Sequence, residues 1–289
     1  MAPASPLQPR ADLTPAQWLV GAIPAFGARV DELLPRGYPA YVRLFHRPDQ
    51  GIPGRDDDRS WAQAAQRHGT VLHPAAQWRA LTRDSADDDV FHSDVQSEIF
   101  RSDPTEGTLD RDTLTRLATL LSRHTETPER CYLALWDGFG QLPNSWRTAP
   151  TVALPGRDYL LFGPTSIGTV PDHAVDFEVA GWEEESDSPT GIAWRVTARL
   201  DSDEPAPIDP QAASAEFARQ MREQHATQSP TLWWPEDHAW IVLSEIDFDS
   251  TLIGCSVPLR DALLADPDLE CLEVGPDTSL ADDADLINT

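Results

Sequence analysis

The chain has 289 residues, 40% of them apolar, which is enough to bury a substantial core and excludes a fully disordered polymer. Its 48 acidic and 22 basic residues leave a net charge of −26, and every basic residue is an arginine. Such a surface repels phosphate and anionic lipid, so binding to a nucleic-acid backbone or a membrane surface is disfavoured. No apolar run reaches the length of a membrane span, and the N-terminus lacks a signal-peptide core. We therefore expect a soluble cytoplasmic protein.

The first half of the chain predicts a flexible arm followed by alternating short elements. Residues 1–12 are rich in proline and predict the arm. One helix is predicted to begin at Pro15, with Thr14 as its cap, and to run through Trp18, Leu19 and Ile23. Apolar spacing and cap residues predict further helices over 28–34, 61–68 and 74–81. Residues 38–46 predict the first strand, and the acidic stretch 83–107 predicts a surface loop.

The second half begins with the clearest helix, over 111–123, which Asp110 caps and which carries a leucine stripe. A sub-domain boundary is placed near 125–130. The apolar run 131–136 predicts a central strand, and 151–154 with 159–162 predict a hairpin. An acidic, proline-rich excursion covers 183–210 and includes a candidate strand over 192–200, and 212–225 predicts a helix.

Helices and strands follow one another without the regular rhythm of a doubly wound sheet, and no glycine-rich phosphate loop occurs. The pattern predicts an α+β fold with a mixed or mostly antiparallel sheet and helices packed on one side. Residues 13–289 are predicted to form a single domain.

The stretch from Trp233 to Val274 is the densest in aromatic residues, strand formers and turn residues. If residues 245–249 form a strand, Glu245, Asp247 and Asp249 share one face, with Asp237 and His238 on the preceding turn. Oxygen ligands arranged in this way suit Mg²⁺ or Ca²⁺. The alternative is a strand whose polar side chains face water, with no metal or other cofactor.

Four further residues are candidates for a ligand or partner surface. Ser256 precedes a short helix, where it either assists an anion at the helix terminus or simply caps the helix. Trp233, Trp234 and Trp240 either form an aromatic platform or act as core anchors. The three cysteines Cys131, Cys255 and Cys271 form neither a disulfide framework nor a metal motif.

The segment Leu232-Trp233-Trp234-Pro235, continued by Asp237, Ala239 and Trp240, carries a resemblance. Together with Glu245-Ile246-Asp247-Phe248-Asp249-Ser250-Thr251 and Gly254-x-Ser256, it resembles a group of uncharacterised cytosolic proteins from high-GC actinobacteria. Residues 41–46 and His73-Pro74-x-x-Gln77-Trp78 are similar as well. The resemblance implies a cytosolic location, and it assigns no activity and no functional residue.

The residues favour a soluble acidic module that binds or neutralises a basic partner protein. A strong field of one sign speeds association with a partner of the opposite charge. The alternative is a metal-dependent hydrolase or transferase that uses the carboxylates of residues 245–249.

Salt should stabilise this protein. Because the acidic residues exceed the basic ones, the net charge of −26 remains even if every arginine is paired, and the folded chain suffers self-repulsion. Raising sodium chloride from 0.1 to 1 M shortens the Debye length from about 10 to about 3 Å. We expect the melting temperature, measured by calorimetry, to rise by at least a few degrees. A fall over this range would contradict a largely unpaired acidic surface.

Overall fold

The structure, a computed structural model, describes six stretches of the chain: residues 8–48, 60–83, 103–140, 142–172, 175–176 and 227–288. The chain divides into two compact units, and unit 2 comprises residues 175–228. Unit 2 is described only by β5 (Val175–Asp176) and β6 (Thr227–Gln228), which pair antiparallel. All that follows concerns unit 1.

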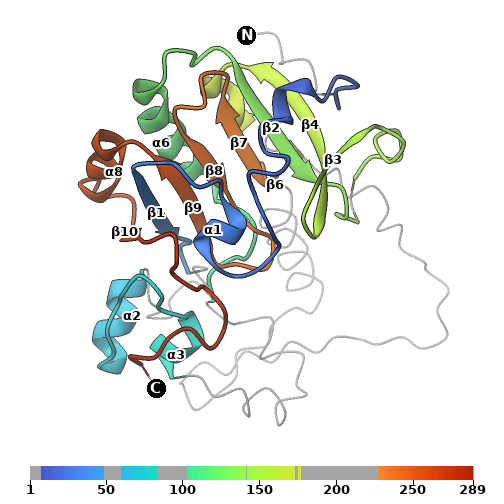
Figure 1. Ribbon diagram of the computed structural model, residues 1–289. Helices are drawn as coiled ribbons and strands as arrows, with labels where there is room; N and C mark the ends of the chain where they lie inside the picture. The colour runs from blue at the N-terminus through green and yellow to red at the C-terminus, as the bar shows by residue number, and fades with distance from the viewer. Residues whose placement is uncertain are drawn as a thin grey trace, which may run out of the picture. The chain divides into compact units, whose positions relative to one another are not determined.

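Unit 1 is built on one eight-stranded antiparallel sheet (Figure 1). Its strands are β1 (Ala40–Phe45), β2 (Cys131–Trp136), β3 (Thr151–Leu154), β4 (Arg157–Thr165), β7 (Leu232–Pro235), β8 (Ile241–Leu243), β9 (Ser250–Cys255) and β10 (Cys271–Val274). Their order is β10-β1-β9-β8-β7-β2-β4-β3. The first strand in sequence therefore lies between the last two, and the predicted α+β class with an antiparallel sheet is confirmed.

The predicted strands 38–46 and 131–136 and the predicted hairpin are present, with a tighter turn than expected. Leu154 pairs directly with Arg157, so only Pro155 and Gly156 form the turn between β3 and β4. Gly156 has φ +77°, a conformation that glycine adopts without a steric penalty. The turn chemistry thus sets the register of this edge of the sheet.

Two helices have the predicted caps. Ser60 accepts a hydrogen bond from the backbone N–H of Gln63 at the start of α2 (Trp61–His68). Asp110 accepts from the N–H of Thr113 at the start of α6 (Arg111–Leu121), which η2 (Ser122–His124) extends. The remaining helical elements of unit 1 are η1 (Thr14–Ala16), α1 (Val30–Leu33), α3 (Trp78–Thr82), η3 (Ile167–Asp172) and α8 (Val257–Leu264).

The predictions of longer helices near the N-terminus are wrong. The helix predicted from Pro15 is reduced to η1 (Thr14–Ala16), turns follow over 17–22, and within 28–34 only α1 is helical. Gly21 has φ +84°, which breaks the helical pattern in this segment. The predicted helix over 74–81 begins only at α3, because tertiary hydrogen bonds occupy the backbone before it.

The two faces of the sheet are covered by different parts of the chain. Trp234 belongs to the front core, on which η1 and α1 pack. Trp233 precedes Trp234 on β7, so its side chain lies on the back of the sheet, where its ring contacts Trp240. The indole N–H of Trp240 donates to the carbonyl of Leu121 at the end of α6, which places α6 on the back (Figure 1). Helix α8 packs against α6 and β1.

The end of the predicted N-terminal arm contacts the sheet. Arg10 donates its backbone N–H to the carbonyl of Leu161 at 2.7 Å and its guanidinium to that of Gly163 at 2.5 Å. Residues 1–7 lie outside the described residues, as do 183–210, 212–225 and most of 83–107. Residues 125–130, where a boundary was predicted, connect η2 to β2 within unit 1.

A buried arginine on β1 joins the sheet to α2 and α3. The Arg43 guanidinium donates to the carbonyls of Pro74 and Ala76 at 3.1 and 2.7 Å. It also donates to the hydroxyl of Ser250 and pairs with Asp249 at 3.2 Å. The carbonyls of residues 74 and 76 are therefore committed to Arg43, which explains why α3 starts late. The Arg43 side chain is only 1% exposed.

Removing the Arg43 charge should be severely destabilising. Arg43→Met leaves Asp249 and two carbonyls without their donors, and breaking a buried pair in this way costs about 3–5 kcal/mol. Chemical denaturation measures the loss. Asp249→Asn should also destabilise, whereas the Arg43→Met/Asp249→Asn double variant should recover part of the loss.

Arg130→Met is the matched control, since Arg130 forms an exposed pair with Glu236. Its effect should be much smaller than that of Arg43→Met. Equal losses in the two variants would contradict the assigned role of Arg43.

Candidate functional site

Of the two alternatives for Trp233, Trp234 and Trp240, the structure supports core anchors, because all three are 0% exposed. Trp234 packs against Tyr132 and Trp18 in the front core, and Trp233 packs against Trp240 on the back. Both faces of the sheet are covered, so rings on the central strand β7 are buried whichever way they point. All three are core anchors.

Ser256 caps a helix. Its hydroxyl accepts a hydrogen bond from the backbone N–H of Leu259 at 3.4 Å, at the start of α8. Pro258 occupies one of the first helical positions, where a backbone N–H is not needed. The capping alternative accounts for this residue.

Asp237 and His238 lie on the turn between β7 and β8, where each makes structural contacts. The Asp237 carboxylate accepts hydrogen bonds from the Thr125 hydroxyl and the backbone N–H of Glu126, which lowers the pKa of Asp237 against the effect of burial. The His238 ring stacks on Trp18 with centroids 4.2 Å apart. These contacts join the turn to neighbouring segments.

The predicted strand over 245–249 is wrong. Residues 244–249 connect β8 to β9, and the N–H of Phe248 donates to the carbonyl of Glu245 to close a turn. Glu245 and Asp247 both contact Arg157, whereas Asp249 pairs with Arg43. Across the described ranges, no group of three or more His, Cys, Asp or Glu side chains is arranged to hold a metal ion.

A buried chain of hydrogen bonds links His46, Thr251 and Ser244. The Nδ1 of His46 donates to the carbonyl of Thr105 at 2.6 Å, so its Nε2 accepts from the Thr251 hydroxyl at 2.8 Å. Thr251 in turn accepts from the Ser244 hydroxyl at 2.7 Å. All three side chains are buried, and burial lowers the pKa of His46 to about 4. This chain stabilises the interior and presents no hydroxyl to solvent.

The most unusual surface lies on the segment from Trp18 to Ala28, which contains no polar side chain. Only Leu19 and Ile23 are fully buried from this segment. Val20 remains 49% exposed and Phe26 47% exposed. An apolar segment this exposed is unexpected on a chain that carries a net charge of −26.

Phe26 is held in place by an arginine stack at the turn between β3 and β4. The Arg157 guanidinium lies 5.0 Å from the Phe26 centroid and 5.0 Å from that of Trp136. Its Nε donates to the buried Glu245 at 2.7 Å. A Cβ on Gly156 would lie 2.5 Å from the Phe26 ring, so only glycine allows this contact.

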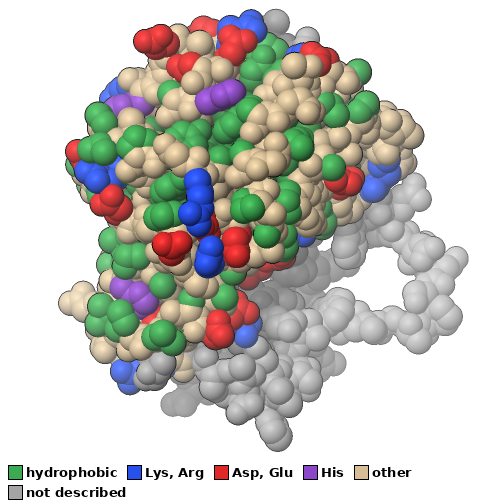
Figure 2. All heavy atoms as spheres, in the orientation of Figure 1, with side chains coloured by type: hydrophobic (Ala, Val, Ile, Leu, Met, Phe, Trp, Pro, Cys, Tyr) green, Lys and Arg blue, Asp and Glu red, His purple; other side chains and the backbone are tan. Residues whose placement is uncertain are grey.

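We define the Phe26 face as the exposed apolar side chains of residues 18–28 together with the Phe26–Arg157–Trp136 stack. Figure 2 shows that this side of the molecule carries mostly hydrophobic and uncharged atoms over the N-terminal segment, β2 and β4, with charged side chains around them. Protein–protein interfaces are commonly poor in charged residues at the centre and polar at the rim, and the Phe26 face has the same distribution.

Two aspartates follow residues of this stack in the chain, but Asp158 lies on the opposite face of β4 from Arg157 and Tyr159. Asp247 pairs with Arg157, and the backbone N–H of Asp137 donates to the carbonyl of Asp158. Burial and the nearby charge of Asp158 raise the pKa of Asp137. Within the described part of the chain, neither Asp137 nor Asp158 has a cationic partner.

Sequence reasoning missed the Phe26 face because it assigned the segment through Trp18, Leu19 and Ile23 to a helix and gave Phe26 no role. The signal was present in the sequence as a stretch without polar residues, which has no hydrophilic side to expose. Its contact with Arg157 joins segments more than a hundred residues apart and has no local signature.

No protein-family model, curated protein or solved structure matches this chain. None of the helices in the described ranges has the length and apolar composition needed to cross a membrane.

Burial of neutral His46 makes stability depend on pH. The pKa of His46 is about 4 when folded and about 6.5 when unfolded, so the unfolded chain binds the extra proton between these values. The stabilisation is fully present above pH 6.5 and is lost as pH falls towards 4. The shift corresponds to about 3 kcal/mol at most.

The measurement compares the unfolding free energies of the wild type and His46→Gln at pH values from 4 to 8. Only the wild type contains this histidine, so the difference between the two should shrink as the pH falls. A difference that stays constant with pH would show that residue 46 does not titrate as described.

Proposed function

We propose that this chain is an acidic interaction module of the cytoplasm that binds a basic partner protein through the Phe26 face. The observation that carries the proposal is the exposure of a charge-free apolar segment, anchored by the contact of Phe26 with Arg157. The free cysteines Cys131, Cys255 and Cys271 suit a reducing compartment.

The Phe26 side chain is preorganised for binding. Its ring is fixed between Gly156 and the Arg157 guanidinium, so little conformational entropy remains to be lost. Aromatic residues and arginine are enriched among the residues that dominate binding energy. Covering the exposed half of the ring would contribute about 1–2 kcal/mol.

The charge at the rim selects the partner. The exposed Asp247 carboxylate beside Arg157 can accept an arginine or lysine of the partner. The net charge of −26 also attracts a basic protein from a distance and repels nucleic acids. Partner association should therefore be fast at low salt and slower at high salt.

The absence of lysine simplifies the test. An amine-reactive biotin reagent at near-neutral pH attaches to the α-amine alone, so every immobilised molecule is held by its N-terminus. Extract from the producing organism is passed over this surface at low salt and eluted with a salt gradient, and retained proteins are identified by mass spectrometry. The dominant one is then purified for affinity measurements.

Phe26→Ser should weaken binding of the purified partner by about tenfold, because one exposed aromatic anchor is lost. Val257→Ser is the matched control, since Val257 is 40% exposed at the start of α8 on the back of the sheet. Calorimetry or surface plasmon resonance gives both affinities. The proposal would be contradicted if the retained protein is acidic. It would also be contradicted if Phe26→Ser and Val257→Ser weaken the affinity for the purified partner equally.

A further inference from the structure

The C-terminal strap, defined as residues 276–288, is held in place by polar contacts. Its backbone meets the N-terminal segment where the N–H of Leu280 donates to the carbonyl of Ala28, and where Ser279 bridges to Arg29. Leu280 is buried in the front core. The strap is thus an ordered part of unit 1.

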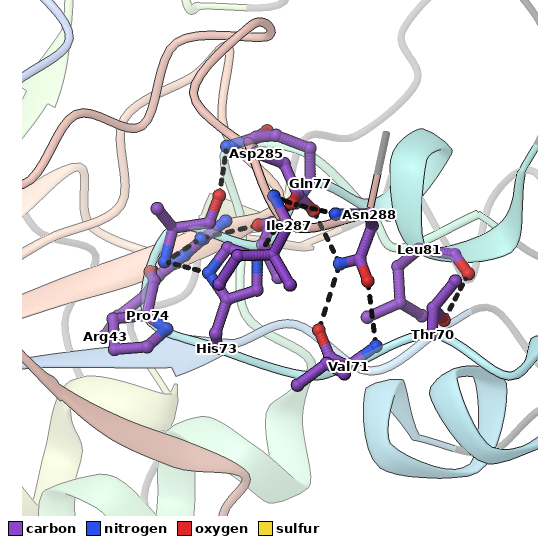
Figure 3. A network of polar contacts seen from close by, with 12 residues as sticks. Arg43, Thr70, Val71, His73, Pro74, Gln77, Leu81, Asp285, Ile287 and Asn288 are labelled. Atoms are coloured by element: carbon purple, nitrogen blue, oxygen red, sulfur yellow. Dashed lines mark hydrogen bonds and ion pairs between the residues drawn. The ribbon is translucent and has the colours of Figure 1, made fainter.

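Asp285 provides the main attachment of the strap (Figure 3). Its carboxylate accepts hydrogen bonds from His73 Nε2 at 2.8 Å and from the backbone N–H of Gln77 at 3.2 Å. It also accepts from the backbone N–H groups of Ile287 and Asn288 and from the Asn288 side chain. These donors lower the pKa of Asp285 to about 2, so the carboxylate stays ionised.

Asn288 completes the attachment because its side-chain amide makes the two hydrogen bonds to the Val71 backbone that a neighbouring strand would make. Its side-chain oxygen accepts from the N–H of Val71 at 2.8 Å, and its amide donates to the carbonyl of Val71 at 3.0 Å. Figure 3 shows the two hydrogen bonds that join the Asn288 side chain to the backbone of Val71. The backbone around these residues is therefore fixed on both sides.

This rigid junction exposes aliphatic side chains. Leu286 is 79% exposed, Ile287 59% and Val71 55%, the highest values for large apolar side chains in the described part of the chain. Isolated exposed aliphatic residues are common. Here three exposed aliphatic side chains lie at one junction, and the polar contacts of Asp285 and Asn288 hold their backbone in place. The three side chains therefore form a preorganised apolar surface that a partner can cover.

The charges nearby indicate what would cover it. Asp282 and Asp283 are exposed on the same strap, and neither has a cationic partner among the residues that the structure describes. The charge of Asp282 contributes to raising the pKa values of Glu106 and Asp249, so negative potential accumulates here. A second copy, with its own charge of −26, would be repelled, whereas a basic segment would be attracted.

We propose that Val71, Leu286 and Ile287 form a second docking surface, separate from the Phe26 face, for a basic segment with aliphatic side chains. The aliphatic side chains of that segment cover the three exposed residues, and its lysines or arginines lie beside Asp282 and Asp283. This surface does not depend on the function proposed for the Phe26 face.

The probe is a synthetic, fluorescein-labelled amphipathic peptide of leucine and lysine, about 18 residues long with the leucines on one helical face. Fluorescence anisotropy measures its affinity for the full chain and for four variants. These are Leu286→Ser/Ile287→Ser, Asp282→Asn/Asp283→Asn, Phe26→Ser and the control Val257→Ser. A scrambled peptide of the same composition measures attraction by charge alone.

The Leu286→Ser/Ile287→Ser variant should lose about tenfold or more in affinity, as burial of two aliphatic side chains implies. Asp282→Asn/Asp283→Asn should lose less, and its deficit should shrink at high salt. Phe26→Ser and Val257→Ser should bind as the unsubstituted chain does. Because the serine substitutions lie on exposed positions, thermal melting should confirm that the fold is retained.

Four outcomes would overturn the proposal. They are equal binding by all variants, equal binding of the scrambled peptide, a loss caused by Phe26→Ser instead, and no measurable binding to the unsubstituted chain. Sedimentation velocity provides a further check. A dimer of the unsubstituted protein that disappears in Leu286→Ser/Ile287→Ser would assign the surface to a second copy.

Discussion

The guanidinium of Arg43 lies in the interior on β1, where a charge is stable only with a full set of acceptors. Asp249 supplies the opposite charge, and Ser250 and the carbonyls of residues 74 and 76 take the other donors. Its Cζ lies 4.6 Å from the centroid of the Phe45 ring and 5.5 Å from that of Trp61. A single side chain thus joins the central sheet, the connection from β8 to β9 and the segment before α3.

The consequences of this constraint extend to the C-terminus. Because Arg43 holds the carbonyls before α3, the adjacent N–H of Gln77 points to Asp285 instead of entering a helix. Asp285 then fixes the end of the chain, including the exposed Leu286 and Ile287. Polar contacts in the interior therefore determine which apolar side chains remain on the surface.

The Phe26 face and the surface at the C-terminal strap are built in a similar way. In each, a carboxylate with several donors or a stacked arginine fixes the backbone, and aliphatic or aromatic side chains project from it. Arg157, held by Glu245, serves the Phe26 face, and Asp285 serves the C-terminal strap. Such order reduces the entropy lost on binding, and the net negative charge is the basis for proposing a basic partner for each surface.

Local signals in the sequence were sufficient for several elements. Ser60 and Gly69 delimit α2, Asp110 starts α6, and the apolar run 131–136 forms the central strand β2 as predicted. These elements depend on caps and on periodicity within a few residues. The antiparallel α+β class could be inferred for the same reason.

The sequence by itself determined the composition, two helix caps, the strands β1 and β2 and the strong negative charge, because these depend on neighbouring residues or on simple counting. Only the tertiary structure decided that Glu245, Asp247 and Asp249 lie on a connection and contact two different arginines. Only it decided that Trp233, Trp234 and Trp240 are buried while Phe26 is not. The physical reason is that burial and ion pairing depend on which distant segments cover a residue, and no local pattern encodes that contact.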